Sequence, residues 1–365
     1  MFTTAIGLLC LSVGNPAEAG YRPSRELALD ACQAMSFEGW NLVAQDAQDL
    51  EARLKAHPED TDARAVLIGY YAHVKQAAEA RGANPDLVRH LAWVVGHQPW
   101  AGIAGMETIR IFRFQSAESW ASLKALWLEA IRSHRNDARV LGNAAHFLRM
   151  ENDRLAAELL ERAVSLEPDD PYWHKELASA WKTLAGKEGG DARRALWVRA
   201  LGEIEKAWTL QRGARKSLLL DDSAEAAIEA GALARARDRA NEILADGTLS
   251  PGSLQVYRAR IVLARAALAS GDLVVMRDAL HKAGEGAAEA VRFSTPSMAL
   301  IEDLLARGAK DDALDYIKRC EPLWPDHVEK LRDWSALIRQ GQDPATSSWY
   351  VPVRPAGASS ATTSN

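Results

Sequence analysis

The sequence predicts an all-α fold built from consecutive helical hairpins. The 365-residue chain is rich in Ala, Leu, Arg and Glu and sparse in Thr, Ile and Val, a bias that favours helix along its whole length. Apolar residues recur three and four positions apart in successive segments, as they do on one face of a helix. Short polar or glycine-containing turns separate these segments, and no segment shows the strict alternation that is typical of a strand.

The composition narrows the class of protein. Hydrophobic residues make up 48% of the chain and charged residues 25%, and the mean hydropathy is -0.22, which excludes wholesale disorder and a multi-span membrane protein. Three cysteines exclude a disulfide scaffold. The net charge of -5 provides no excess positive field, so we expect no nucleic-acid partner.

The first twenty residues contain an apolar run, Ala5 to Val13, followed by the small-residue sequence Ala17-Glu18-Ala19. This order resembles the apolar region and cleavage site of a secretory signal. We therefore expect residues 1–19 to be removed and the mature chain, from Gly20, to be periplasmic or secreted. The run is too short for a spanning helix, so no stable membrane insertion is expected.

Two alternatives to cleavage stay open at this stage. No Lys or Arg precedes the apolar run, which suits a frayed or buried N-terminal helix in a cytoplasmic protein. Cys10 raises a lipoprotein interpretation, but Leu9 stands before it where a small residue is expected.

The clearest hairpin lies between Asp137 and Pro168. Two helices are expected on either side of the polar turn at residues 151–153, and Pro168 ends the second helix. Apolar residues mark one face of each helix: Val140, Ala144, Phe147 and Leu148, then Ala156, Leu159, Leu160 and Ala163.

This segment resembles a tetratricopeptide repeat (TPR), a 34-residue helix–turn–helix unit. Val140 takes the place of the pattern's tryptophan, Asn143-Ala144 that of Leu-Gly, and Phe147 that of the tyrosine. Ala156, Leu160, Ala163 and Pro168 follow at the later offsets of the pattern without a gap. The resemblance implies a right-handed α-solenoid and covers roughly residues 40 to 326, although other helical-pair repeats stay possible because several spacings exceed the repeat length.

Six further hairpins are expected around the clearest one. Their helices are expected near residues 58–73 with 84–99, 101–112 with 116–137, 173–184 with 191–210, 217–229 with 233–244, 253–269 with 273–283, and 297–306 with 310–320. The last three turn at Gly231, Gly271 and Gly308. A polar amphipathic helix from His327 to Gln340 is expected to cap the array, giving one solenoid over residues 20–345. The Pro-, Ser- and Thr-rich residues 346–365 are expected to be a disordered tail.

No catalytic or cofactor motif stands out. The phosphate-binding, nucleophile-elbow and zinc-helix motifs are absent from the sequence, so no cofactor or metal is expected. His90 and His97 lie about 10 Å apart by helix rise, too far to share an ion, and we expect surface or hairpin-packing roles for them. Carboxylate pairs at Asp221-Asp222 and Asp311-Asp312 suit helix caps or solvated faces.

Tryptophans and arginines each allow two interpretations. Trp93, Trp127, Trp181, Trp197 and Trp208 lie in apolar helical patterns and are expected in the core, whereas Trp100, Trp173 or Trp181 alternatively faces a groove as an anchor. A basic stretch suits a solvated exterior, with an acidic peptide or a lipid headgroup as the alternative partner. Its members are Arg193, Arg194, Arg199, Arg212, Arg215, Lys216, Arg235, Arg237 and Arg239.

The TPR resemblance implies that the first helix of each hairpin lines a concave, partner-binding face. It directs Leu141, Ala145, Leu148, Arg149, Tyr172, Lys175, Ser179 and Lys182 toward that groove. Arg149, Lys175 and Lys182 suit a carboxylate or another acidic group, and Tyr172 suits a flanking contact. Ala145 and Ser179 stand where the carboxylate-clamp subtype has asparagines, so that specific activity is not expected.

We therefore expect a non-enzymatic scaffold that binds a protein or peptide segment. Two other functions stay open from the sequence: a helical-repeat accessory or substrate-delivery factor of an envelope or polymer-processing enzyme system, and a lipid-surface or envelope-assembly accessory.

Overall fold

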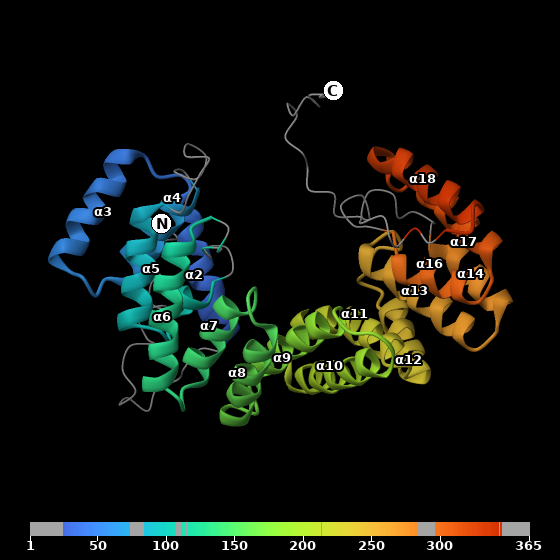
Figure 1. Ribbon diagram of the computed structural model, residues 1–365, viewed down its shortest axis with the longest axis horizontal. Helices are drawn as coiled ribbons and strands as arrows, with labels where there is room; N and C mark the ends of the chain where they lie inside the picture. Colours follow the sequence, from blue (N-terminus) through green and yellow to red (C-terminus); the bar gives the residue numbers. More distant parts are fainter. Residues whose placement is uncertain are drawn as a thin grey trace, which may run out of the picture. The chain divides into compact units, whose positions relative to one another are not determined.

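The structure is a computed structural model that describes residues 25–73, 84–106, 111, 113, 115–212, 214–283, 296–342 and 344. The expected signal peptide, residues 1–19, and the expected tail, residues 346–365, both lie outside these ranges. The described residues form helices and turns without a strand, which confirms the all-α prediction (Figure 1). The chain divides into two compact units, the first extending to Leu219 and the second beginning at Leu220.

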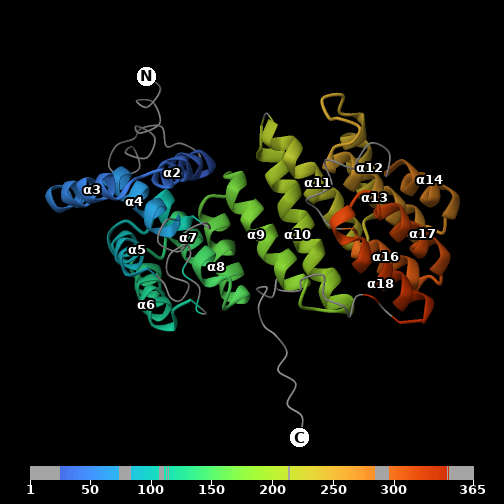
Figure 2. The same cartoon turned by 90° about the horizontal axis from the view of Figure 1, so that it is seen from above.

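The first unit contains nine α-helices and one 3-10 turn within its described residues. They are α2 (Arg25–Gly39), α3 (Ala44–Ala56), α4 (Thr61–His73), α5 (Pro85–His97), η1 (Gly102–Gly105), α6 (Ala117–Ser133), α7 (Ala138–Leu148), α8 (Asp153–Leu166), α9 (Pro171–Ala185) and α10 (Gly190–Leu210). From α4 to α10 each α-helix packs against the next one in the chain, and Figure 2 shows this succession. This nearest-neighbour packing is the pattern of a helical-repeat stack.

Helices α2 and α4 cross at two glycines. A Cβ atom at Gly69 would lie 2.9 Å or less from three backbone atoms of Ser36, and one at Gly39 would lie within 3.0 Å of backbone atoms of α4. Only glycine permits helices to approach this closely, so the crossing fixes the identity of both residues.

The hairpin of α7 and α8 has the predicted boundaries. The Asp137 side chain accepts hydrogen bonds from the backbone N–H groups of Arg139 and Val140, which starts α7. Asn152 caps α8 by accepting from the N–H of Leu155. Ala144 and Ala156 are fully buried, as the repeat register requires.

One predicted helix is wrong. Residues 102–105 form a 3-10 turn, and Met106 is extended, where a helix over residues 101–112 was expected. The glycines at both ends of the turn disfavour an α-helix. As a result, α6 packs against α5 and α7, without a helical partner from residues 101–106.

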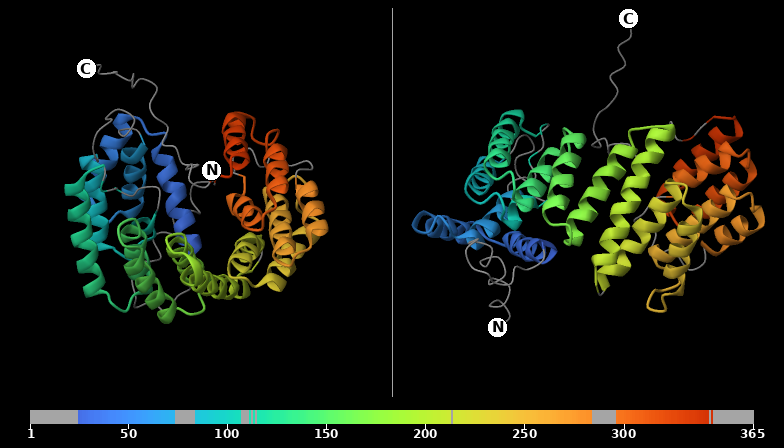
Figure 3. Two further views of the ribbon diagram at one scale, coloured as in Figure 1. Left: turned by 45° about the vertical axis from the view of Figure 1, so that its right-hand side comes forward. Right: turned by 90° about the horizontal axis from the view of Figure 1, so that it is seen from below.

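Helix α11 (Ala214–Glu229) spans the division between the units. The helices beyond it are α12 (Leu233–Ala245), α13 (Leu254–Ala269), α14 (Leu273–Ala283), α16 (Met298–Ala306), α17 (Lys310–Cys320) and α18 (Val328–Arg339), with the 3-10 turn η3 (Pro325–His327) before the last. In the second unit α13 packs against α12, α14 and α16, and α17 packs against α16 and α18 (Figure 3).

Glycines end the helices of the second unit at the predicted turns. Gly231, Gly271 and Gly308 have φ angles of 77°, 80° and 73°, in the left-handed region that glycine adopts without strain. At each turn the following residue's N–H bonds to the carbonyl five residues earlier, for example Asp272 to Ala267 at 2.9 Å. This is the Schellman arrangement, and it confirms the three predicted turns.

Helix α18 covers the end of the second unit's core, as predicted for residues 327–340. Leu331, Trp334 and Ile338 are buried in the cluster that α13, α14, α16 and α17 form. The hydrophobic side of the last hairpin is thereby removed from water. Because each unit is described by itself, the expectation of one solenoid over residues 20–345 stays a prediction.

Candidate partner-binding surface

The predicted binding residues lie on α7 and α9, two helices with well-defined starts. Helix α9 begins at Pro171, and the Asp170 side chain accepts from the N–H of Tyr172. The indole of Trp173 is fully buried and lies against Gly142 of α7. The two helices are therefore fixed in rotation, which determines which residues of α9 face outward.

Helix α7 is buried along its whole length. Leu141, Ala145 and Leu148, expected to line a groove, are at most 1% exposed. Part of the cover comes from residues 99–101, where the Asn143 amide donates to the carbonyls of Pro99 (2.7 Å) and Ala101 (3.1 Å). The irregular segment that replaces the predicted helix thus occupies space beside α7.

Tyr172, expected to be a flanking contact for a ligand, is instead buried beneath Lys175. Its side chain is 4% exposed, and its hydroxyl lies 3.0 Å from Nε2 of His146. Glu176, on the next turn of α9, lies 3.5 Å from the same nitrogen. Nζ of Lys175 stands 5.0 Å from the centroid of the Tyr172 ring, within the range of a cation–π contact.

Lys175 and Lys182 share one outer face of α9, two turns or about 10 Å apart. Both are half-buried, since their aliphatic stems pack against protein. Nζ of Lys182 lies 5.9 Å from the Trp197 ring centroid, and Nζ of Lys175 lies 3.9 Å from the Glu176 carboxylate. Arg149, also half-buried, caps the C-terminus of α7 through its backbone N–H. Lys175 and Lys182 are thus two cations on one face of α9, each with an aromatic ring within 6 Å.

His174, on the inner side of α9, holds α10 in place. Its Nδ1 lies 2.6 Å from the Glu203 carboxylate, and its Nε2 lies 2.8 Å from the Pro168 carbonyl oxygen. Burial acts to lower the pKa of His174, but the hydrogen bonds to Glu203 and Pro168 outweigh burial, so the pKa is raised. The contact between His174 and Glu203 thus joins α9 to α10, and His174 itself is buried.

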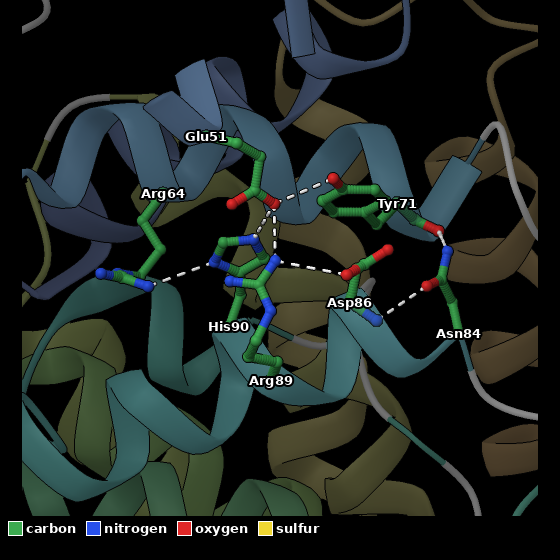
Figure 4. A network of polar contacts seen from close by, with 7 residues as sticks. All are labelled: Glu51, Arg64, Tyr71, Asn84, Asp86, Arg89 and His90. Atoms are coloured by element: carbon green, nitrogen blue, oxygen red, sulfur yellow. Dashed lines mark hydrogen bonds and ion pairs between the residues drawn. The ribbon is translucent and has the colours of Figure 1, made fainter. Parts of the chain in front are cut away.

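A second polar cluster, which the sequence analysis missed, joins α3, α4 and α5 (Figure 4). One carboxylate oxygen of Glu51 accepts hydrogen bonds from the Tyr71 hydroxyl (2.9 Å) and the Arg89 guanidinium (2.6 Å), and it lies 3.0 Å from Nε2 of His90. Arg64 lies 3.1 Å from Nδ1 of His90. Because arginine only donates, Nδ1 accepts and Nε2 carries the proton that bonds Glu51.

The charges in this cluster suit a structural role. Burial raises the pKa of Glu51, but the hydrogen bonds from Arg89, His90 and Tyr71 outweigh it and lower the pKa to about 2. Burial lowers the pKa of His90, which keeps the imidazole neutral at pH 7. The ring of His90 is fully buried, so we assign the cluster to the attachment of α3.

The tryptophans follow the core interpretation for the most part. Trp127, Trp181 and Trp197 are buried, while Trp93 and Trp208 are half-buried. Trp173 is also buried, so the alternative that Trp173 or Trp181 anchors a ligand is wrong. His90 and His97 have separate contacts, since His97 stacks on Trp93 with ring centroids 4.6 Å apart.

The basic stretch is partly engaged within the protein. The Arg199 guanidinium lies 3.5 Å from the Trp181 ring centroid and pairs with Glu161. Arg239 is buried and lies 2.9 Å from the Glu242 carboxylate. Arg194 and Lys206 of α10 are exposed.

Within the described ranges, no group of three or more His, Cys, Asp or Glu residues is arranged to hold a metal ion. None of the helices that the structure describes is long and apolar enough to cross a membrane.

No protein-family model matches the chain, and no curated protein matches it. Solved structures of human IFIT1 are similar at low identity. The human IFIT1 dimer with PPP-AAAA is 17% identical, with 92% of this chain and 76% of that chain covered and a TM-score of 0.44. A monomeric mutant of IFIT1 with Gppp-AAAA is 18% identical, with 94% and 75% covered and a TM-score of 0.45.

These neighbours correct one prediction. Both are structures with an RNA ligand, so the exclusion of a nucleic-acid partner, which rested on the net charge, is contradicted. The physical reason is that net charge averages over the whole surface, whereas binding depends on the local field. At these TM-scores the likeness transfers no ligand to this chain.

Proposed function

We propose that the chain is a non-enzymatic scaffold whose first unit captures an acidic segment of a partner protein on the outer face of α9. The observation that carries the proposal is the pair Lys175 and Lys182, on one face of a helix whose opposite side is locked by buried aromatics. A cation held by its surroundings loses little side-chain freedom on binding, which favours affinity.

The spacing of the cations suits an extended segment. In a polyproline II segment, carboxylates on every third residue lie on one side about 9 Å apart, close to the rise between Lys175 and Lys182. Arg149 adds a planar guanidinium, which binds a carboxylate in two parallel hydrogen bonds where geometry permits.

Capture of partners from an extract of the native source tests the proposal. The full chain is compared with the triple variant Arg149→Glu, Lys175→Glu and Lys182→Glu. The matched control is the triple variant Arg154→Glu, Arg194→Glu and Lys206→Glu, which makes the same charge change at exposed positions of α8 and α10.

We expect the first variant to lose most capture and the control to keep it, with both melting near the parent because surface charges contribute only about 0–1 kcal/mol each. Undiminished capture by the first variant would move the interface away from α9, and loss by the control alone would assign it to α8 or α10. Turnover of a substrate by the purified protein, abolished by one acid substitution, would contradict the non-enzymatic role.

A further inference from the structure

The second unit contains a groove that the function proposed above does not use. It has a volume of about 1040 Å³ and lies over α13 between α12 and α14, with the loop from α12 to α13 at one end. Its two sides, α12 and α14, are second members of successive hairpins, and α13 between them is a first member.

The floor of the groove is apolar and accessible. Leu244, Leu249 and Leu263 line it and are only half-buried. At its edge α14 begins with Leu273, Val274 and Val275, which are 40%, 77% and 50% exposed, and Val275 lines the groove. Three consecutive exposed apolar residues at the edge of a hollow form a surface typical of a protein contact.

Two arginines of the lining lack a carboxylate partner among the described residues. The Arg237 guanidinium bonds to the Ser270 hydroxyl and lies 3.3 Å from the Ala266 carbonyl oxygen. The Arg260 guanidinium bonds to the Lys282 carbonyl oxygen. All these acceptors are neutral, so both positive charges stay uncompensated while their guanidinium planes are held in place.

The acidic residues of the lining are already engaged. Asp278 lies 2.7 Å from Nζ of Lys282. Asp272 accepts from the N–H of Val275 in the first turn of α14, where the helix dipole favours a negative charge. Asp246 accepts from both the backbone and the hydroxyl of Thr248, and these bonds lower its pKa. Lys282 neutralises Asp278, and the dipole of α14 offsets part of the charge of Asp272. The two arginines therefore outnumber Asp246, the carboxylate of the lining that keeps its full charge.

We propose that this groove binds an acidic amphipathic peptide segment of a partner, with apolar side chains on Leu244, Leu249, Leu263 and Val275 and carboxylates on Arg237 and Arg260. The volume accommodates a few bulky side chains but is small for a folded domain. Apolar anchors supply affinity, while the arginines select acidic segments and fix their register.

A random peptide library selected on the immobilised full chain tests this inference. We expect enriched sequences that combine Glu or Asp with Leu, Ile or Phe. The enriched peptides should bind the double variant Arg237→Glu/Arg260→Glu about tenfold or more weakly. The control Arg235→Glu/Arg332→Glu, which changes the same charge outside the groove, should bind them like the parent.

Replacing the arginines also removes their hydrogen bonds within the protein, so a second pair of variants tests the groove without them. Val275→Ser removes an exposed apolar contact that lines the groove, and Val274→Ser removes a neighbouring one that does not. We expect weaker peptide binding by Val275→Ser, about fivefold, and less than about twofold by Val274→Ser.

Several results would overturn the inference: no enrichment, enrichment of basic sequences, or binding that the groove variants leave unchanged. A random single-stranded RNA oligonucleotide that binds the parent and not the double variant would assign the groove to nucleic acid instead. The Lys175→Glu/Lys182→Glu variant should bind the enriched peptides normally, so failure of the α9 proposal and failure of this one are distinguishable.

Discussion

Gly142 of α7 and Trp173 of α9 fit together so closely that a Cβ atom at residue 142 would lie within 3.0 Å of three carbons of the indole ring. The indole is fully buried, so it has no free space into which to move. This contact sets the distance between two first helices of successive hairpins, and it orients the cationic face of α9.

The Gly142→Ala variant should therefore be destabilised although alanine favours helix. We expect a loss of about 1–3 kcal/mol in the free energy of unfolding, measured by denaturant titration, because one added methyl overpacks the contact. Gly202→Ala in α10 is the matched control, since a Cβ atom there meets nothing within 4 Å. That control should gain about 0.5–1 kcal/mol. Equal effects of the two variants would refute the close contact.

Ala156 tests the repeat register of α8. The residue is fully buried where α8 packs against α7, so Ala156→Trp should lower the free energy of unfolding by about 1–3 kcal/mol or more. Ala195→Trp, on the exposed side of α10, should change it by less than about 1 kcal/mol. A thermal melt of Ala156→Trp that matches the parent's would show that the register is misplaced.

Acid should release α3 before the rest of the first unit. The pKa of Glu51 is about 2 in the folded chain against an ordinary 4.5, so its ionised form is favoured by folding. The resulting stabilisation is fully present above about pH 4.5 and is lost as the pH falls through 2. The pKa of His90 is also lowered from 6.5, so protonation of His90 in the unfolded chain adds destabilisation in the same direction below that pH.

Hydrogen exchange of the α3 amides measures this effect. We expect the α3 amides of Glu51→Gln to exchange faster than the parent's at neutral pH, and their exchange to depend less on acid. The reason is that a neutral glutamine lacks the negative charge that strengthens the bonds from Tyr71, Arg89 and His90. Glu38→Gln is the control, since Glu38 is exposed at the end of α2. Parent-like protection of α3 in Glu51→Gln would show that the cluster does not attach the helix.

The expected signal peptide is tested by sequencing the N-terminus of protein from the native source. We expect the mature chain to begin near Gly20, because an apolar run and the sequence Ala17-Glu18-Ala19 precede it. Protein from the cytosol that begins at Met1 or Phe2 would contradict both cleavage and the periplasmic or secreted location.

Local signals explain which parts of the fold could be predicted. Gly231, Gly271 and Gly308 were identified as turns because the left-handed conformation that ends a helix favours glycine regardless of the rest of the fold. The α7–α8 hairpin was identified because its pattern of small and large residues is continuous. Residues 102–105 are apolar enough to resemble part of a helix, but Gly102 and Gly105 favour the 3-10 turn that the structure shows.

The Glu51 cluster was not predictable in the same way. Glu51 and His90 lie on different helices, and their sequence spacing carries no signal of the 3.0 Å contact between them. A glutamate within a charged helix is usually solvated, so nothing local distinguishes Glu51 from its neighbours. The burial of Tyr172 was missed for a related reason, since the repeat pattern gives the face of a helix but not what covers it.

The salt dependence of partner binding tests the central claim most directly. The dissociation constant of a captured partner would be measured at several salt concentrations for the parent chain and for the Arg149→Glu, Lys175→Glu and Lys182→Glu triple variant. If fixed cations on α9 hold acidic groups, the parent's binding weakens steeply with salt, while the variant binds weakly with a much smaller dependence. Equal affinity and equal salt dependence in the two proteins would contradict the account.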